Sequence, residues 1–220
     1  MDYDTTRGKY SHQQIITDFE QGRIHVLVGT QMVTKGLDFD NVALVGILNA
    51  DSMFHFPDFR AYERAFQLMM QVSGRAGRKG EQGNVLIQTY DEQHEMFKLL
   101  KANDYIAFIR KQIEERQTFN YPPYSRVIQI TLKHKNQRIL DDAALQLVIQ
   151  MRKSFRERVL GPEYPVISRI RNYYHKNVLL KIEQEGSITE AKNILQTIIS
   201  SMQDYQNFKS IRFILDVDPI

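Results

Sequence analysis

Two short apolar runs near the start of the chain constrain its fold more than any other feature. Residues 24–28 and 42–48 are almost uninterrupted in apolar character, which is typical of parallel strands covered on both faces. An amphipathic helix is predicted before the first run, with Ser11 as its N-cap and Gly22 just after its end. Residues 83–89 indicate a further strand. This alternation of helix and strand predicts an α/β domain built on a parallel sheet.

A second predicted helix, residues 58–72, ends in a stretch rich in arginine and glycine. Its apolar residues recur at helical spacing, and Asp58 follows a proline at the place of an N-cap. After Gln71 come Gly74, Arg75 and Arg78. A guanidinium group is a planar, permanently charged fork that suits phosphate oxygens. Alone, such an end is more often a basic surface turn, but a second motif upstream favours a phosphate-binding role.

That second motif is the loop at residues 29–39, directly after the first apolar run. Ligand sites of open α/β sheets gather at the carboxyl ends of strands, which is where this loop is predicted. The two stretches together resemble motifs V and VI of the second RecA-like lobe of superfamily 2 helicases. The matching positions are Thr30, Lys35, Gly36, Leu37 and Asp38 for motif V, and Gln71, Gly74, Arg75 and Arg78 for motif VI.

The resemblance extends along the whole chain to one family of that superfamily, the primosomal protein N′ family of bacterial replication-restart helicases. The segments that carry it are residues 4–9, 29–39, 48–51, 71–78, 121–124 and 215–219. It implies an ATP-dependent 3′-to-5′ DNA helicase that binds stalled or repaired replication forks and starts primosome assembly. The alternative is a DNA- or partner-binding module of another superfamily 2 helicase, without activity of its own.

The resemblance also implies roles for the motif residues. Arg75 and Arg78 would stabilise the transferring phosphoryl group as arginine fingers do, and Gln71 would sense the nucleotide state. Residues expected to contact the nucleotide are Gly36, Asp38 and Gly74. Residues expected to contact the DNA backbone are Thr30, Gln31 and Lys35, the last of which could also be an ordinary solvated lysine.

No P-loop of the form G-x-x-x-x-G-K-[ST] occurs in the sequence. We therefore expect this chain to be the C-terminal part of a longer protein, to share ATP and Mg²⁺ with an upstream lobe, and to be inactive alone. The family also carries zinc-binding cysteines, which would lie upstream. The sequence has no cysteine and its six histidines lack ligand spacing, so we expect no metal site in this chain.

The segment Tyr121-Pro122-Pro123-Tyr124 is the best domain boundary, because prolines cannot continue a helix. We expect a partial RecA-like lobe at 1–90, a helical bridge at 91–120 that starts at Asp91 and breaks at Asn103-Asp104, and a C-terminal α+β domain at 121–220. The order of strands and helices in this last domain resembles a split β-α-β unit of the ferredoxin-like kind. The predicted strands and helices are 127–132, 139–155, 158–160, 167–171, 176–182, 189–205 and 209–217, with Ser187 or Thr189 capping the last helix.

The two strands at 167–171 and 176–182 are predicted to join at a hairpin-like tip, residues 172–175. The basic and aromatic residues at this tip and at the strand ends beside it are Arg169, Arg171, Tyr173, Tyr174, His175 and Lys176. Cations interleaved with aromatic rings suit single-stranded nucleic acid, although an exposed hairpin with solubilising charge is an equally ordinary explanation. Weaker candidates are Arg126, Lys133 and Lys135. The resemblance implies that this domain binds forked DNA and the acidic tail of single-stranded DNA-binding protein, together with other primosome proteins.

The loop at residues 49–59 leaves two questions open. Asp51 is either a solvated acid or a residue that positions the arginines, and Phe54 and Phe56 could stack on bases or hold the helix onto the sheet. The formal net charge of +3 excludes a global polycationic surface, so any DNA-binding surface must be local. Without a membrane-spanning run or a signal peptide, we expect a cytoplasmic, nucleoid-associated protein.

Overall fold

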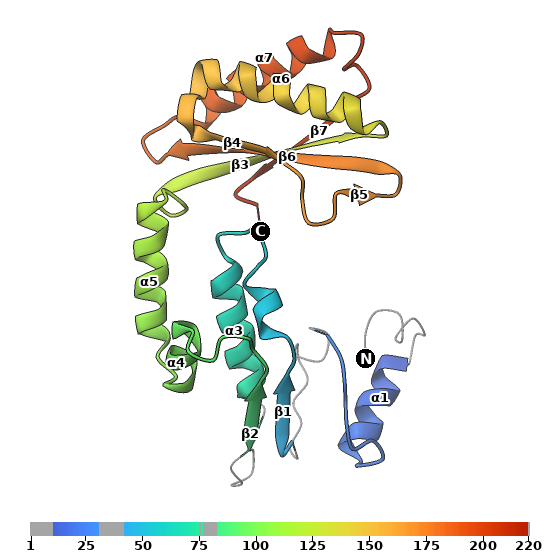
Figure 1. The fold of residues 1–220 in the computed structure, drawn as a ribbon, viewed down its shortest axis with the longest axis vertical. Helices are drawn as coiled ribbons and strands as arrows, with labels where there is room; N and C mark the ends of the chain where they lie inside the picture. The colour runs from blue at the N-terminus through green and yellow to red at the C-terminus, as the bar shows by residue number, and fades with distance from the viewer. Residues whose placement is uncertain (1–10, 31–41, 75, 77–82, 220) are drawn as a thin grey trace. The chain divides into compact units, whose positions relative to one another are not determined.

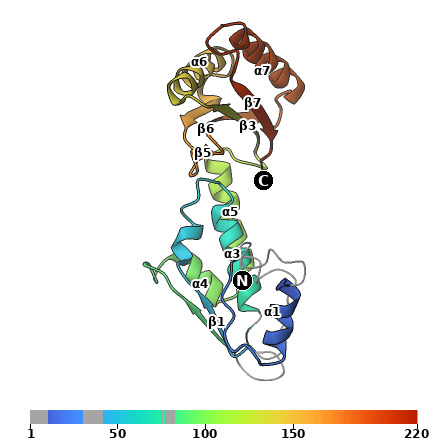
Figure 2. The same cartoon turned by 90° about the vertical axis from the view of Figure 1, so that its right-hand side faces the viewer.

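The chain divides into two compact units, residues 1–110 and residues 111–220, called here the N-terminal unit and the C-terminal unit. The division falls within helix α5 (Tyr105–Thr118). The computed structural model (Figures 1 and 2) describes residues 11–30, 42–74, 76 and 83–219.

The N-terminal unit has a small parallel sheet with helices beside it. Strands β1 and β2 pair in parallel, with Leu44 opposite Asn84 and Ile47 opposite Ile87, as the apolar runs predicted. Its core joins Ile47 of β1 to buried residues of the helices, among them Phe66 and Phe108, whose rings stack with centroids 4.1 Å apart. Besides α5, its elements are α1 (Ser11–Glu20), β1 (Leu44–Ile47), the 3₁₀ helix η1 (Ala50–Met53), α3 (Ala61–Ser73), β2 (Asn84–Ile87) and α4 (Glu95–Lys101).

The predicted strand at residues 24–28 is wrong. The segment is irregular, and Val26 and Val28 are 74% and 69% exposed. A strand forms only where a neighbouring strand supplies hydrogen-bond partners, and among the described residues of this unit only β1 and β2 pair. Among the described residues, the sheet face that carries Leu44 and Leu86 is less covered than predicted, because both side chains are more than half exposed.

Two predicted helix caps are displaced. Helix α3 starts after Arg60, and Asp58 instead accepts a hydrogen bond from the Arg60 N–H (2.9 Å) and pairs with Arg64 (2.7 Å). Helix α4 starts after His94, whose ring accepts from the Met96 N–H, and Asp91 instead accepts from the Gln93 N–H in the preceding turn. In both cases the acidic side chain caps a turn before the helix, a role for which Asp is equally suited.

Two other predicted helix boundaries are confirmed. Asn103 has a left-handed backbone (φ 54°), and Asp104 then caps α5 by accepting from the Ala107 N–H at 2.9 Å. Gly22 likewise has φ 71°, the conformation that commonly follows a helix end.

The C-terminal unit is a ferredoxin-like domain, as predicted. Its sheet has the strand order β4-β6-β3-β7, every neighbouring pair is antiparallel, and the short β5 adds to β6. Figures 1 and 2 show α6 and α7 together on one face of this sheet. Its elements are β3 (Ser125–His134), α6 (Gln137–Phe155), the 3₁₀ helix η2 (Arg156–Arg158), β4 (Val159–Glu163), β5 (Arg169–Ile170), β6 (Tyr173–Glu183), α7 (Ile188–Gln203) and β7 (Arg212–Val217).

One continuous core joins the two helices to the sheet. Ile128, Ile130 and Leu132 alternate along β3 and are fully buried beneath the helices. Both helices begin at side-chain caps, which satisfy N–H groups that have no partner inside the helix. The Asn136 side chain accepts from two N–H groups of α6, and Ser187 accepts from the Glu190 N–H of α7.

The predicted tip at residues 172–175 is shorter than expected. Arg171 and Asn172 both have left-handed backbones (φ 47° and 64°), as a two-residue hairpin turn requires. The turn therefore closes between Ile170 and Tyr173, which face each other across β5 and β6. As a result, Tyr173, Tyr174 and His175 belong to strand β6 rather than to a loop.

Candidate helicase and DNA-binding site

The sequence of α3 places the start of the arginine motif at a helix end outside the core. Ala65, Phe66 and Met69 bury one stripe of the helix, and Gln71 lies on its exposed side. Gly74 follows the last turn and donates its N–H to the Met70 carbonyl at 3.0 Å. Arg75 and Arg78, the proposed arginine fingers, lie outside the described residues.

The predicted nucleotide and DNA contacts of the upstream loop are only partly described. Thr30 is exposed at the end of the irregular segment that follows α1. Gln31, Lys35, Gly36 and Asp38 lie outside the described residues. Of the predicted site residues in the two motifs, the structure therefore describes Thr30 of the first motif and Gln71 and Gly74 of the second.

Asp51 has a structural role at the end of β2. Its carboxylate accepts a hydrogen bond from Thr89 Oγ1 at 2.8 Å and another from the Tyr90 N–H at 3.0 Å. Desolvation raises the pKa of this carboxyl, but these hydrogen bonds, together with its own backbone N–H and the nearby His55, outweigh it and hold the pKa below the ordinary value. Asp51 thus attaches η1 to the segment after β2, a function that neither sequence interpretation included.

Phe54 packs within the unit instead of facing solvent. Its ring stacks on Tyr62 (5.3 Å between centroids) and on His94 (5.7 Å). This arrangement favours the interpretation in which Phe54 holds helix α3 in place. Phe56, in contrast, is 57% exposed and remains available for a ligand. His94 was not predicted in this cluster, because no local pattern relates it to Phe54.

The candidate DNA-binding residues of β5 and β6 differ in their surroundings. Arg169 is exposed, donates to the Asn172 side chain at 3.2 Å, and lies over the Tyr174 ring at 5.1 Å. Arg171 is exposed in the turn. Burial, followed by the positive charge of Lys133, lowers the pKa of His175, so this imidazole is neutral near pH 7.

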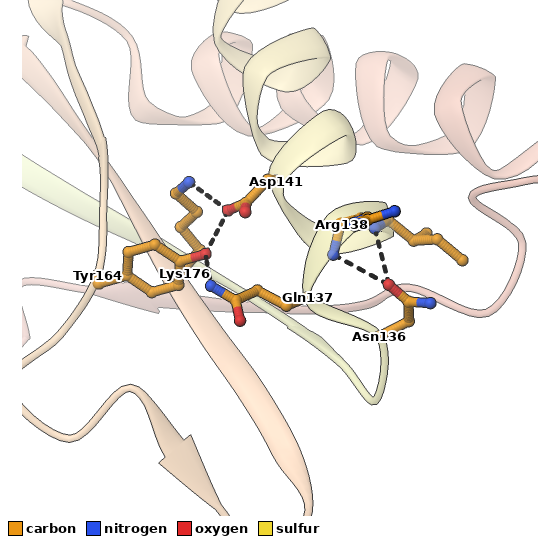
Figure 3. A network of polar contacts seen from close by, with 7 residues as sticks. Asn136, Gln137, Arg138, Asp141, Tyr164 and Lys176 are labelled. Atoms are coloured by element: carbon orange, nitrogen blue, oxygen red, sulfur yellow. Dashed lines mark hydrogen bonds and ion pairs between the residues drawn. The ribbon is translucent and has the colours of Figure 1, made fainter.

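Lys176 differs from the other candidate DNA-binding residues because its charge is engaged in an ion pair. Its ammonium lies 2.5 Å from the Asp141 carboxylate, and its side chain is only 13% exposed. Tyr164 donates to the same carboxylate oxygen at 2.5 Å and accepts from Gln137 at 3.0 Å (Figure 3). Desolvation raises the pKa of Asp141, but the hydrogen bonds from Lys176 and Tyr164 outweigh it and hold the pKa below its ordinary value. This network ties α6 to β6 and to the segment after β4.

Tyr173 has two cationic neighbours, only one of which the sequence suggested. Lys135 lies 5.7 Å from the ring centroid, and the Arg212 guanidinium lies 5.1 Å from it. Arg212 is on β7, whose register on β3 places it opposite Lys133. No sequence signal relates Arg212 to Tyr173, because their proximity depends on the strand order.

Two features bear on metal and membrane binding. Within the described ranges, no group of three or more potential metal-ligating side chains comes together. None of the helices described is both long and apolar enough to cross a bilayer.

Comparison with known proteins first defines the class. Residues 3–80 match the helicase conserved C-terminal domain, and residues 117–220 match the primosomal protein N C-terminal domain. The first match contains both motifs, and the second contains the ferredoxin-like domain. The chain thus combines the second lobe of a helicase with a domain found in primosomal proteins.

Individual relatives agree with these matches along the whole chain. The replication restart protein PriA of Bacillus subtilis is 36% identical over all of this chain, which covers 27% of that protein. The PriA of Synechocystis is 36% identical over all of this chain and 26% of its own length, and that of Haemophilus influenzae is 32% identical over all of it and 30% of its own length. The chain belongs to the PriA family and corresponds to its C-terminal part, spanning between a quarter and a third of these relatives.

Proposed function

We propose that this chain is the C-terminal part of an ATP-dependent 3′-to-5′ DNA helicase that binds stalled or repaired forks and starts primosome assembly for replication restart. The observation that carries the proposal is the likeness, along the whole of this chain, to the corresponding part of proteins named replication restart protein PriA. The helicase-domain match at residues 3–80 supports it independently. The position of Gln71 and Gly74 at the exposed end of α3 is compatible with contact to a second lobe.

In this proposal the motif residues act on ATP bound by an upstream lobe. Bound ATP with Mg²⁺ supplies the phosphoryl group whose transfer drives unwinding. Arg75 and Arg78 stabilise the charge on that group, because guanidinium forks match phosphate oxygens. Gln71 relays the nucleotide state, while Gly36, Asp38 and Gly74 contact the nucleotide. Zinc is bound upstream in the full-length protein and not by this chain.

The arginine assignment is tested in the full-length protein. Arg78→Ala is expected to lower DNA-stimulated ATP turnover by about 10³-fold while DNA binding stays unchanged. Arg64→Ala is the matched control, since Arg64 is an arginine of helix α3, which precedes the motif in the sequence, and it pairs with Asp58. Turnover at the wild-type rate in the Arg78 variant would remove this residue from the mechanism.

We propose that this chain alone does not hydrolyse ATP, because its sequence has no P-loop. The measurement is release of inorganic phosphate by the purified chain, with and without forked DNA. Turnover that rises with added DNA and persists after further purification would refute this part of the proposal.

The DNA contacts come from both units. Thr30, Gln31 and Lys35 contact the backbone of the strand that is moved, and hydroxyl, amide and ammonium groups all suit phosphate oxygens. In the C-terminal unit the contacts are Arg169, Arg171, Tyr173 and Tyr174. Lys176 was predicted with them but is left out of these contacts, since its ammonium is paired with Asp141, which offsets its charge.

Charge reversal tests the C-terminal contacts. The double variant Arg169→Glu, Arg171→Glu is expected to weaken binding to forked DNA and to reduce its salt dependence, because fewer counterions are released. Fluorescence anisotropy across a salt series measures both. Unchanged affinity and slope would show that this hairpin does not contact DNA.

Partners and location follow from the same proposal. Single-stranded DNA-binding protein and other primosome proteins dock on the full-length protein at forks, and the protein works in the bacterial cytoplasm at the nucleoid. The second candidate function, a DNA- or partner-binding module without activity, is favoured by the separate core of the C-terminal unit. The Arg78→Ala measurement decides between the two.

A further inference from the structure

The sheet of the C-terminal unit has one face on which Tyr173 is the one residue among the contacts proposed above. Helices α6 and α7 cover the opposite face (Figures 1 and 2). Side chains of an antiparallel sheet alternate between faces, and directly opposite residues share a face. The face away from Leu132 and its buried neighbours is called here the open face.

Three cations and one aromatic ring gather at one end of the open face. Lys133 lies opposite His175 on β6 and opposite Arg212 on β7. Tyr173 is two residues from His175, so it shares this face. Its half-buried ring lies 5.7 Å from the Lys135 ammonium and 5.1 Å from the Arg212 guanidinium.

The carboxylates on the open face of the described residues lie away from this end. Asp216 is opposite Gln129, four residues along β7 from Arg212. Glu183 is at the far end of β6, where it pairs with Arg158 at 3.7 Å. Glu163 is exposed on the edge strand β4, opposite Asn177. The end around Tyr173 is therefore locally cationic in a protein whose net charge is only +3.

Apolar side chains extend this surface beside the cations. Ile170 faces Tyr173 across the hairpin and is 46% exposed. Ile214 follows Arg212 on the same face of β7 and is 45% exposed. Exposed apolar area next to a ring and a guanidinium plane provides surfaces on which a flat base can stack, while the neighbouring ammonium groups suit phosphates.

We propose that this end of the open face binds single-stranded DNA, with a base stacked on Tyr173 and phosphates paired with Lys133, Lys135 and Arg212. A duplex does not fit this arrangement, because its bases are stacked on each other and cannot reach the ring. The inference rests on the proposed DNA-binding role and specifies the strand state and the surface. The surface extends onto β3 and β7, beyond the β5–β6 hairpin considered above.

The experiment uses the full chain and fluorescein-labelled DNA in anisotropy titrations. The probes are a 20-nucleotide oligo(dT) and a 20-base-pair duplex. We expect tighter binding of the single strand, a loss of about tenfold for Tyr173→Leu, and near wild-type affinity for Tyr173→Phe, which keeps the ring. Arg212→Gln combined with Lys135→Gln is expected to flatten the salt slope by roughly 0.7 for each charge removed.

Matched controls separate the surface from general charge and folding. Tyr205→Leu removes a tyrosine that is 63% exposed in the turn after α7, and Lys192→Gln removes an exposed cation on α7. Neither change is expected to alter oligo(dT) affinity. Circular dichroism and thermal unfolding check that every variant is folded.

Each other outcome overturns the inference in a recognisable way. If Tyr173→Leu weakens duplex binding as much as oligo(dT) binding, or does not weaken oligo(dT) binding, Tyr173 does not stack on a single-stranded base. Either result rejects the proposed surface but leaves DNA binding by this unit in place. Failure of the chain to bind either DNA would reject the proposed DNA-binding role as well. Binding of a fluorescein-labelled ten-residue poly-glutamate peptide, lost in the Tyr173→Leu variant, with no anisotropy change for oligo(dT), would identify a surface for acidic peptides instead.

Discussion

The two units of this chain contain similar apolar sequence but bury it to very different extents. In the C-terminal unit β3 pairs on both sides, and its apolar residues lie under two helices. In the N-terminal unit, among the described residues, only β1 and β2 pair, and leucines on both strands face solvent. The comparison shows that an apolar run predicts a strand but does not determine whether anything covers it.

The strongest test of this difference applies the same substitution to both sheets. Leu180→Ala on β6 empties a fully buried site and is expected to destabilise the C-terminal unit by about 3 kcal/mol. Leu86→Ala on β2 removes a side chain that is 62% exposed and should change stability by less than about 0.5 kcal/mol. Native-state hydrogen exchange of the β6 and β2 amides measures both effects. Equal effects would show that the two sheets are equally well covered.

A pair of glycines gives a smaller contrast. Gly161 in β4 has φ 96°, and an added Cβ would lie 3.0 Å from the Asn177 carbonyl oxygen. Gly161→Ala is therefore expected to destabilise the C-terminal unit by about 1–3 kcal/mol. Gly46 in β1 has open space around its Cβ position, and Gly46→Ala should be neutral or slightly stabilising. Thermal unfolding of both variants checks the sign of each change.

Two ion pairs, one in each unit, give the smallest expected difference in stability. Asp141→Asn removes the charge that holds Lys176, a largely buried ammonium, and is expected to destabilise by about 1–2 kcal/mol. Asp58→Asn weakens a more exposed pair with Arg64 and is expected to cost about 0.5 kcal/mol. Urea denaturation at pH 7 measures both.

The first of these pairs also has a defined pH dependence. The folded-state pKa of Asp141 is lowered, so its stabilising effect is complete above the unfolded carboxyl value of about 3.9 and is lost as pH falls through the lower folded value. The stability difference between the wild type and Asp141→Asn should therefore disappear in strong acid. A difference that stays constant down to pH 2 would contradict this account.

Sequence patterns predicted the local elements well and the relations between distant elements poorly. The amphipathic stripe of α3, the break at Asn103 and the Ser187 cap of α7 depend on neighbours within a few residues, which the sequence displays directly. The cover of β1, the pairing of Lys176 with Asp141 and the approach of Arg212 to Tyr173 depend on strand order and side-chain direction. These follow from three-dimensional packing, and no periodicity in one segment reports them.

The same distinction explains which residues of the candidate site the sequence located correctly. Motif spacing identified Gln71 and Gly74, and the helix pattern placed them at an exposed helix end, as the structure shows. The predicted hairpin tip was too long because the residues with left-handed backbones are Arg171 and Asn172, and only the second is of a type that favours this conformation. The roles of the arginines in ATP turnover remain predictions.

The pairing of β3 with β7 has a consequence for synthesis. β3 is the first strand of its domain and β7 is the last, and the Val127 N–H donates to the Asp218 side chain at 3.1 Å. A nascent chain that has not yet emerged to residue 217 exposes the unpaired edge of β3, which is a site where strands of other molecules can add. Ribosome stalling just before β7 would thus leave a nearly complete domain that is prone to aggregate, and such products are natural targets of chaperones and proteases.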